Sequence, residues 1–259
     1  MLLSMVIAYL FVTIAIGLWA ARRVKNTADF AIAGRHLPMY MIITTTFATW
    51  FGSEIVLGVP AKFIEGGLRG VVEDPFGAGM CLILVGLFFA AKLYRMTLLT
   101  ISDYFRERYG RSVEVICSVI IMVSYLGWVS AQVTALGLVF NVLSDGAISL
   151  PMGMVIGVVS ILAYTLFGGF LAVSITDFVQ GCIMFVALIL VPVVAIDHLG
   201  GLSSVFSQVT ALNADYINPF TNAETAQALS ALGIISLLSW GFGYFGQPHI
   251  IVRFMAIRS

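Results

Sequence analysis

Long apolar stretches separated by short polar connections run through the whole chain. An α-helix needs roughly 20 residues to cross the hydrocarbon core of a bilayer, and seven stretches have about this length. They cover residues of about 2–21, 39–60, 72–92, 113–141, 151–167, 176–197 and 229–254. The pattern predicts an all-α membrane protein with seven transmembrane helices.

Two of these stretches contain residues that interrupt helices. The second contains Gly52, Gly58 and Pro60, and the seventh contains Pro248 after the three glycines of residues 240–247. Irregular backbone is tolerated at membrane depth only where it lines a protein-walled cavity, and broken helices near the midplane commonly bind a transported solute. For Gly52, Gly58 and Pro60, close packing between helices is the alternative explanation.

The composition agrees with a polytopic membrane protein. Of the residues, 60% are hydrophobic and 10% are charged, and the mean hydropathy is +1.04, which is too apolar for a soluble domain. The net charge of zero argues against nucleic acid as a partner. The three cysteines lie singly in apolar stretches, and no GxSxG, P-loop, HExxH or CxxC motif occurs. We therefore expect no enzyme, no cofactor and no metal site of clustered cysteines.

Basic residues are distributed unevenly over the polar connections. If the N-terminus lies outside, eleven lysines and arginines fall on the inner side, and only Lys62 and Arg69 fall on the outer side. Cytoplasmic loops carry such an excess of positive charge. We expect a multi-pass protein of the cell membrane, the inner membrane where there are two, with the N-terminus outside and the C-terminus in the cytoplasm.

The second apolar stretch contains the residues best suited to bind a cation. Glu54 is the only acidic residue in its core, where an unpaired carboxylate costs several kcal/mol; the alternative is a carboxylate at a helix end that extends towards Lys62 or Arg69. The hydroxyls of the stretch are Thr44, Thr45, Thr46, Thr49 and Ser53. Together with freed backbone carbonyls, they offer the oxygen ligands that hard cations such as sodium prefer.

Polar residues also lie between the fifth and sixth stretches. Ser174 and Asp177 fit a variant of the capping box that would begin the sixth helix. Capping explains Ser174 better than Asp177, because Asp177 and Gln180 share one helix face and continue into the apolar stretch. A functional role for Asp177 therefore stays open beside the capping role.

Aromatic residues pair with polar or aromatic residues one helical turn away at two places. Trp240 and Tyr244 are four residues apart, as are Trp128 and Gln132, so each pair shares one helix face. Trp240 and Tyr244 either pack between helices or line a solute pocket. For Gln132, the alternative to a solute contact is a hydrogen bond to a neighbouring helix.

Two long segments, Tyr164–Gln180 and Gly243–Ala256, resemble signatures of the sodium/solute symporter family, nearest to its sodium/proline branch. The segment Ser102–Gly110 and the order of the apolar stretches also resemble this family. The resemblance implies two inverted five-helix repeats preceded by an extra helix. The extra helix would cover about 2–21, the first repeat about 39–197, and the first helix of the second repeat about 229–254. Residues 1–259 would then be the N-terminal part of one symporter domain, and its remaining C-terminal helices would be missing partners.

The resemblance also implies binding residues. The backbone carbonyls of Ala48 and Phe51 would bind sodium, with hydroxyl ligands from a later helix, and Asp177 would lie near the sodium path. Trp50 stands where the proline symporters have an essential aspartate; one turn beyond it, Glu54 either takes over part of the charge balance or belongs to a branch with another solute. The positions assigned to solute binding are Trp50, Glu54, Trp128, Trp240, Tyr244 and Pro248.

The predicted function is sodium-coupled symport by alternating access. The solute would be a small organic molecule, such as proline, another amino acid or a small carboxylate, and Na⁺ would be the coupling ion. The partners would be the solute, sodium and the lipid bilayer. Two alternatives remain open: a transporter-like membrane input domain of a sensor kinase, and an inactive truncated fragment.

Overall fold

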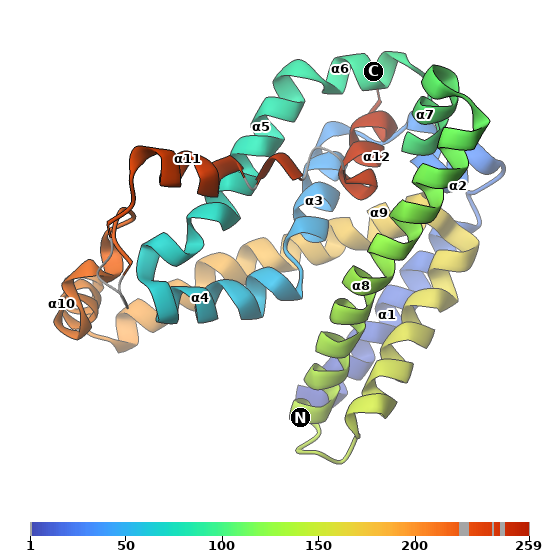
Figure 1. Cartoon of the computed structure of the whole chain (residues 1–259). Coiled ribbons are helices and arrows are strands. Elements are labelled where there is room, and N and C mark those ends of the chain that lie inside the picture. Colours follow the sequence, from blue (N-terminus) through green and yellow to red (C-terminus); the bar gives the residue numbers. More distant parts are fainter. Residues whose placement is uncertain (1, 223–227, 240, 244–246, 259) are drawn as a thin grey trace. The chain divides into compact units, whose positions relative to one another are not determined.

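The computed structural model describes residues 2–222, 228–239, 241–243 and 247–258, and these are helical apart from the connections (Figure 1). Within these ranges the β pairings are isolated bridges between Leu37 and Ile257 and between Thr221 and Ala228. The predicted all-α class is confirmed. The helices are α1 (Leu2–Ala21), α2 (Thr27–Ile32), α3 (Met39–Trp50), α4 (Val59–Gly66), α5 (Ala78–Phe88), α6 (Ala90–Arg95), α7 (Ile101–Tyr109), α8 (Arg111–Leu143), α9 (Leu150–His198), α10 (Leu202–Leu212), α11 (Ala231–Ser239) and α12 (Pro248–Ala256).

The chain forms two compact units. The first consists of residues 1–49, 93–179 and 252–259, and the second consists of residues 50–92 and 180–251.

Long apolar helices dominate the described part of the chain. Four helical segments are long and apolar enough to cross a membrane: Leu3–Ala21, Glu54–Phe88, Arg111–Leu143 and Leu150–His198. The apolar side chains of α8 are largely exposed, which fits contact with lipid or with further helices. The protein is therefore a multi-pass membrane protein, and the count of seven transmembrane helices stays a prediction.

The second apolar stretch is broken, as its glycines predict. Helix α3 ends at Trp50, and helical structure resumes with a π-helical turn at Glu54–Gly58 that leads into α4. At the break, the Gly52 amide donates to the Trp50 carbonyl at 2.9 Å, whereas an α-helix would direct it to the Ala48 carbonyl four residues back. The ladder of helical hydrogen bonds therefore stops after α3.

The seventh apolar stretch is also interrupted in the described residues, because α11 ends at Ser239 and α12 begins at Pro248. Pro248 occupies the first turn of α12, where the N–H that proline lacks would have no helical partner. The expected interruption of this stretch at Pro248 is confirmed.

Helix α9 contains one non-helical residue, Gly169, with φ 49° and ψ −145°. This left-handed φ favours glycine, and a Cβ atom built on Gly169 would overlap the Phe30 carbonyl of α2. Residues 170–198 continue as helix directly after the kink. The predicted polar connection between the fifth and sixth stretches is therefore reduced to a kink.

We expect Gly169→Ala to destabilise the protein by about 2 kcal/mol or more. The left-handed conformation alone costs an L-residue roughly 1–2 kcal/mol, and the new methyl group must also displace α2. Thermal unfolding in detergent measures the effect. Gly127→Ala is the matched control, because Gly127 lies inside α8 with open space around its built Cβ and alanine favours helix by about 1 kcal/mol. Equal unfolding midpoints for the two variants would contradict the prediction.

In the first unit, backbone hydrogen bonds hold the C-terminal end of α12 beside the start of α3. The Leu37 amide donates to the Ala256 carbonyl at 3.3 Å, and the Arg258 amide donates to the Leu37 carbonyl at 2.8 Å. Beneath these bonds lies an apolar cluster of Ile32, Ala33, Leu37, Ile42 and Ala256. This packing holds the C-terminal end of α12 beside the start of α3.

Candidate functional site

A buried ion pair joins three helices of the first unit. Arg253 of α12 lies with Nη2 3.5 Å from Oδ2 of Asp177 in α9, and the side chains are only 5% and 14% exposed. The hydroxyl of Thr45 in α3 donates to the same carboxylate oxygen, and the Arg253 guanidinium donates to Oγ1 of Thr49. We call Thr45, Thr49, Asp177 and Arg253 the polar network.

Helical spacing in α3 explains why the polar network contains two threonines. Thr45 and Thr49 are four residues apart, so they lie on one face and present two hydroxyls to the ion pair. Phe170 covers the guanidinium of Arg253, with its ring centroid 5.4 Å away. A charge pair in such a dry place holds its helices together as long as both partners are present, because the loss of one leaves a buried charge uncompensated.

The capping interpretation of residues 174–177 was wrong. Ser174 is fully buried within α9, and its hydroxyl donates to the Phe170 carbonyl at 2.8 Å, which is a bond inside a helix and no cap. Asp177 lies two turns beyond the kink and is bound by Thr45 and Arg253. Asp177 therefore does not cap a helix, and its functional role stays a prediction.

Of the positions expected near sodium, Ala48 is half-buried and lies in the last turn of α3, between the two threonines of the polar network. Phe51 is half-buried and lies in the break that follows α3. Sodium ligation by these two carbonyls remains a prediction, as does the role of Asp177.

The second unit contains a buried carboxylate that the sequence did not single out. Asp74 is 8% exposed and accepts a hydrogen bond from the Trp50 indole, with Nε1 3.2 Å from Oδ1. Among the described residues, no cationic side chain lies within ion-pair distance of Asp74, and the nearby Lys62 pairs with Glu73 at 2.8 Å. The donor that the structure gives to the Asp74 carboxyl is therefore the Trp50 indole and not a cationic side chain.

Asp74 escaped notice because it stands in Glu73-Asp74-Pro75, a grouping typical of a polar turn. The signal that could have revealed it is the apolar sequence on both sides, since a carboxylate inside a span-length segment is rare. Glu54, which the sequence did single out, is exposed at the start of the π-helical turn. It lies close enough to Asp74 for electrostatic interaction.

Of the other predicted solute positions, the structure describes Trp128 and Pro248. Trp128 is half-buried in α8 and contacts Tyr125 edge to face, with centroids 6.0 Å apart. Pro248 is half-buried at the start of α12. Trp240 and Tyr244 lie outside the residues that the structure describes.

Comparison with known protein families shows which family the chain belongs to. The model of the sodium:solute symporter family matches residues 30–259. The chain belongs to the sodium:solute symporter family. Proteins of this family are transporters and not enzymes, which confirms that prediction.

Several curated members of the symporter family are similar to the chain. It is 38% identical over 254 residues to the high-affinity proline transporter PutP of Bacillus subtilis, a match that covers 94% of this chain and 51% of that protein. It is 34% identical over 259 residues to the osmoregulated proline transporter OpuE of B. subtilis, with 97% and 51% covered. It is 32% identical over 268 residues to sodium/proline symporter 2 of Staphylococcus saprophyticus, with 98% and 50% covered. The chain spans about half the length of these relatives.

Proposed function

We propose that the chain is the N-terminal part of a symporter that couples transport of proline, or a closely related small solute, to sodium. The observation that carries the proposal is the polar network beside the break after α3, in a chain of the sodium:solute symporter family. The names of three relatives, which refer to proline, support this solute. Among the alternatives, these names favour a transporter over a sensor input domain.

The proposed sodium site lies where α3 ends. The Gly52 amide is bonded to Trp50, so the Ala48 carbonyl does not receive the helical hydrogen bond that Gly52 would otherwise donate. Phe51 adds a second carbonyl in the same short segment. Carbonyl oxygens in irregular backbone are suitable ligands for a monovalent cation. Asp177 would attract the cation along its path, and Arg253 would hold this carboxylate in place between ions.

The proposed solute contact is Asp74. Its buried carboxylate can pair with the ammonium group of an amino acid in a charge-assisted hydrogen bond, and the Trp50 indole orients it. Trp50 occupies the position of an essential aspartate in the proline symporters that the chain resembles, and Asp74 supplies a carboxylate directly beside that position. Glu54, Trp128, Trp240, Tyr244 and Pro248 remain the other proposed solute positions.

The proposed architecture is the inverted-repeat transporter fold with seven transmembrane helices. Helix α9 has 49 residues, which suffices for two crossings of roughly 20 residues each, and the kink at Gly169 would lie between them. The first repeat would cover about 39–197, and residues of about 229–254 would open the second. The N-terminus would lie outside and the C-terminus in the cytoplasm.

Alternating access would follow from the broken helices. Sodium bound at the break would order the backbone around Ala48 and Phe51, which lowers the conformational cost of solute binding. The solute would then bind more tightly in the presence of sodium, and sodium more tightly in the presence of solute.

The test is uptake of labelled proline by cells that express the gene containing this chain, with and without an inward sodium gradient. We expect uptake that requires the sodium gradient and is inhibited by excess unlabelled proline. Uptake of equal rate in sodium-free buffer would contradict sodium coupling. Sodium-dependent binding without uptake would instead favour a sensor or an inactive fragment.

A further inference from the structure

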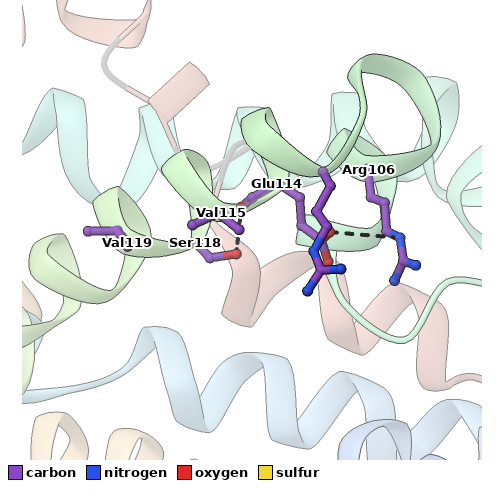
Figure 2. A pocket seen from close by; sticks show the side chains of 6 residues that line it. Arg106, Glu114, Val115, Ser118 and Val119 are labelled. Atoms are coloured by element: carbon purple, nitrogen blue, oxygen red, sulfur yellow. Dashed lines mark hydrogen bonds and ion pairs between the residues drawn. The ribbon is translucent and has the colours of Figure 1, made fainter.

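A hollow of about 360 Å³ lies between α7 and the beginning of α8, within the first unit. Its lining residues are Arg106, Arg111, Glu114, Val115, Ser118 and Val119. The side chains of Arg106 and Glu114 lie towards one end of this set and that of Val119 lies at the other (Figure 2). The lining therefore has a charged end and an apolar end.

The charged end has an excess of positive charge. Arg106 Nε lies 3.8 Å from Glu114 Oε2, and the Arg106 side chain is 63% exposed, so this long contact leaves most of its guanidinium accessible. Arg111 adds a second guanidinium to the lining. Two arginines and one glutamate give a net charge of +1, which a single anionic group would neutralise.

A lining residue of the hollow, Ser118, is hydrogen-bonded to both helices. The Ser118 hydroxyl donates to the Glu114 carbonyl at 2.7 Å and is bonded to the Ser102 hydroxyl of α7 at 2.9 Å. Thr100 and Asp103 form a capping box at the start of α7. The bond between Ser102 and Ser118 therefore links α7 to α8 beside the hollow.

The apolar end leads towards the membrane. Val115 and Val119 are exposed, and the exposed apolar surface of α8 continues with Ile116 and Ile120. Helix α8 is long and apolar enough to cross a membrane, and it begins at Arg111. If α8 crosses the membrane from Arg111 onwards, the charged end of the hollow would lie at the end of that span, near the level of the lipid head groups.

We propose that this hollow binds the phosphate of an acidic membrane phospholipid, with Arg106 and Arg111 on the phosphate and an acyl chain along Val115 and Val119. Charge complementarity favours an acidic lipid over a zwitterionic one, because the lining has a net positive charge. The apolar wall favours a lipid over free phosphate. This site is separate from sodium and solute binding and does not depend on the proposed function.

Native mass spectrometry of the purified protein in detergent tests the proposal. Phosphatidylglycerol and phosphatidylcholine with identical acyl chains are titrated separately. We expect retention of phosphatidylglycerol in clear preference to phosphatidylcholine, and an affinity about fivefold lower in Arg106→Gln and in Arg111→Gln, as expected for the loss of one arginine near a lipid surface. Arg108→Gln is the matched control, because Arg108 is exposed on α7 and is not among the lining residues.

Further variants distinguish the alternatives. Glu114→Gln should strengthen phosphatidylglycerol binding severalfold by removing the negative charge, and Val119→Glu should weaken it with both arginines retained. Unchanged thermal unfolding midpoints in lipid-free detergent would establish that the variants are folded. The proposal is overturned by equal loss in Arg108→Gln, by equal retention of phosphatidylcholine, or by complete competition from inorganic phosphate at concentrations similar to those of the lipid.

Discussion

Arg253→Gln should destabilise the protein by about 3–5 kcal/mol, because it leaves the buried carboxylate of Asp177 without its cation. Arg253 is 4% exposed, so water cannot replace the guanidinium. The Thr45 hydroxyl would remain as a donor to Asp177, but one neutral hydrogen bond does not balance a buried charge. Sodium-dependent uptake should fall at least in proportion to the folded protein that remains.

The double variant Asp177→Asn with Arg253→Gln separates the ion pair from the other contacts of these residues. Since both charges are removed, the double variant should recover a large part of the stability that Arg253→Gln loses. Thermal unfolding in detergent measures stability, and proline uptake measured per folded molecule measures transport. A stable double variant that does not transport would show that transport requires the charged pair itself, whereas full transport would limit the ion pair to a structural role.

Arg258→Gln serves as the matched control, since Arg258 is exposed five residues after Arg253. Its backbone amide bonds to Leu37, and this bond does not require the side chain. We expect a change within about 0.5 kcal/mol, as for other surface substitutions. A comparable loss of stability in Arg258→Gln would contradict a specific role for the buried pair.

Sequence patterns predicted the features that depend on neighbouring residues. The apolar stretches predicted the helical class. Gly52 and Pro248 predicted the two breaks, because glycine and proline change the backbone conformations available at their own positions. Asp177 was noticed because a carboxylate that continues into an apolar stretch is unusual.

Partners distant in the sequence could not be predicted. Thr45 and Asp177 are 132 residues apart, and Arg253 and Thr49 are 204 residues apart, so only the tertiary fold brings them together. Arg253 was one of the eleven basic residues counted on the inner side of the membrane from the sequence. In the structure, it is buried and paired with Asp177. The local pattern also misled at Ser174, because Ser-x-x-Asp fits a cap whereas Ser174 lies inside the helix that continues after the kink at Gly169.

Asp74→Asn should lower the apparent affinity for proline by about 10- to 100-fold, because a hydrogen bond to a charged group contributes roughly 1.5–3 kcal/mol. Asparagine keeps the size of the side chain and removes its negative charge, so the fold should tolerate the change.

Trp50→Phe keeps an aromatic ring but removes the indole N–H, whose nitrogen lies 3.2 Å from Oδ1 of Asp74. We expect this variant to have a smaller effect than most of the range given for Asp74→Asn. The KM for proline should rise by about tenfold, and the maximal rate of uptake should be nearly unchanged.

The solute contact can be separated from a structural role by a second substrate. Tetrahydrofuran-2-carboxylate is the oxygen analogue of proline and lacks the ammonium group, so its inhibition of uptake should be unaffected or improved by Asp74→Asn. Glu73→Gln is the matched control, because Glu73 is the adjacent carboxylate and is paired with Lys62. If Asp74→Asn weakened proline and its oxygen analogue equally, Asp74 would not bind the ammonium group. An unchanged KM for proline in Asp74→Asn would remove Asp74 from the solute site altogether, and Trp50 would then act only through its packing.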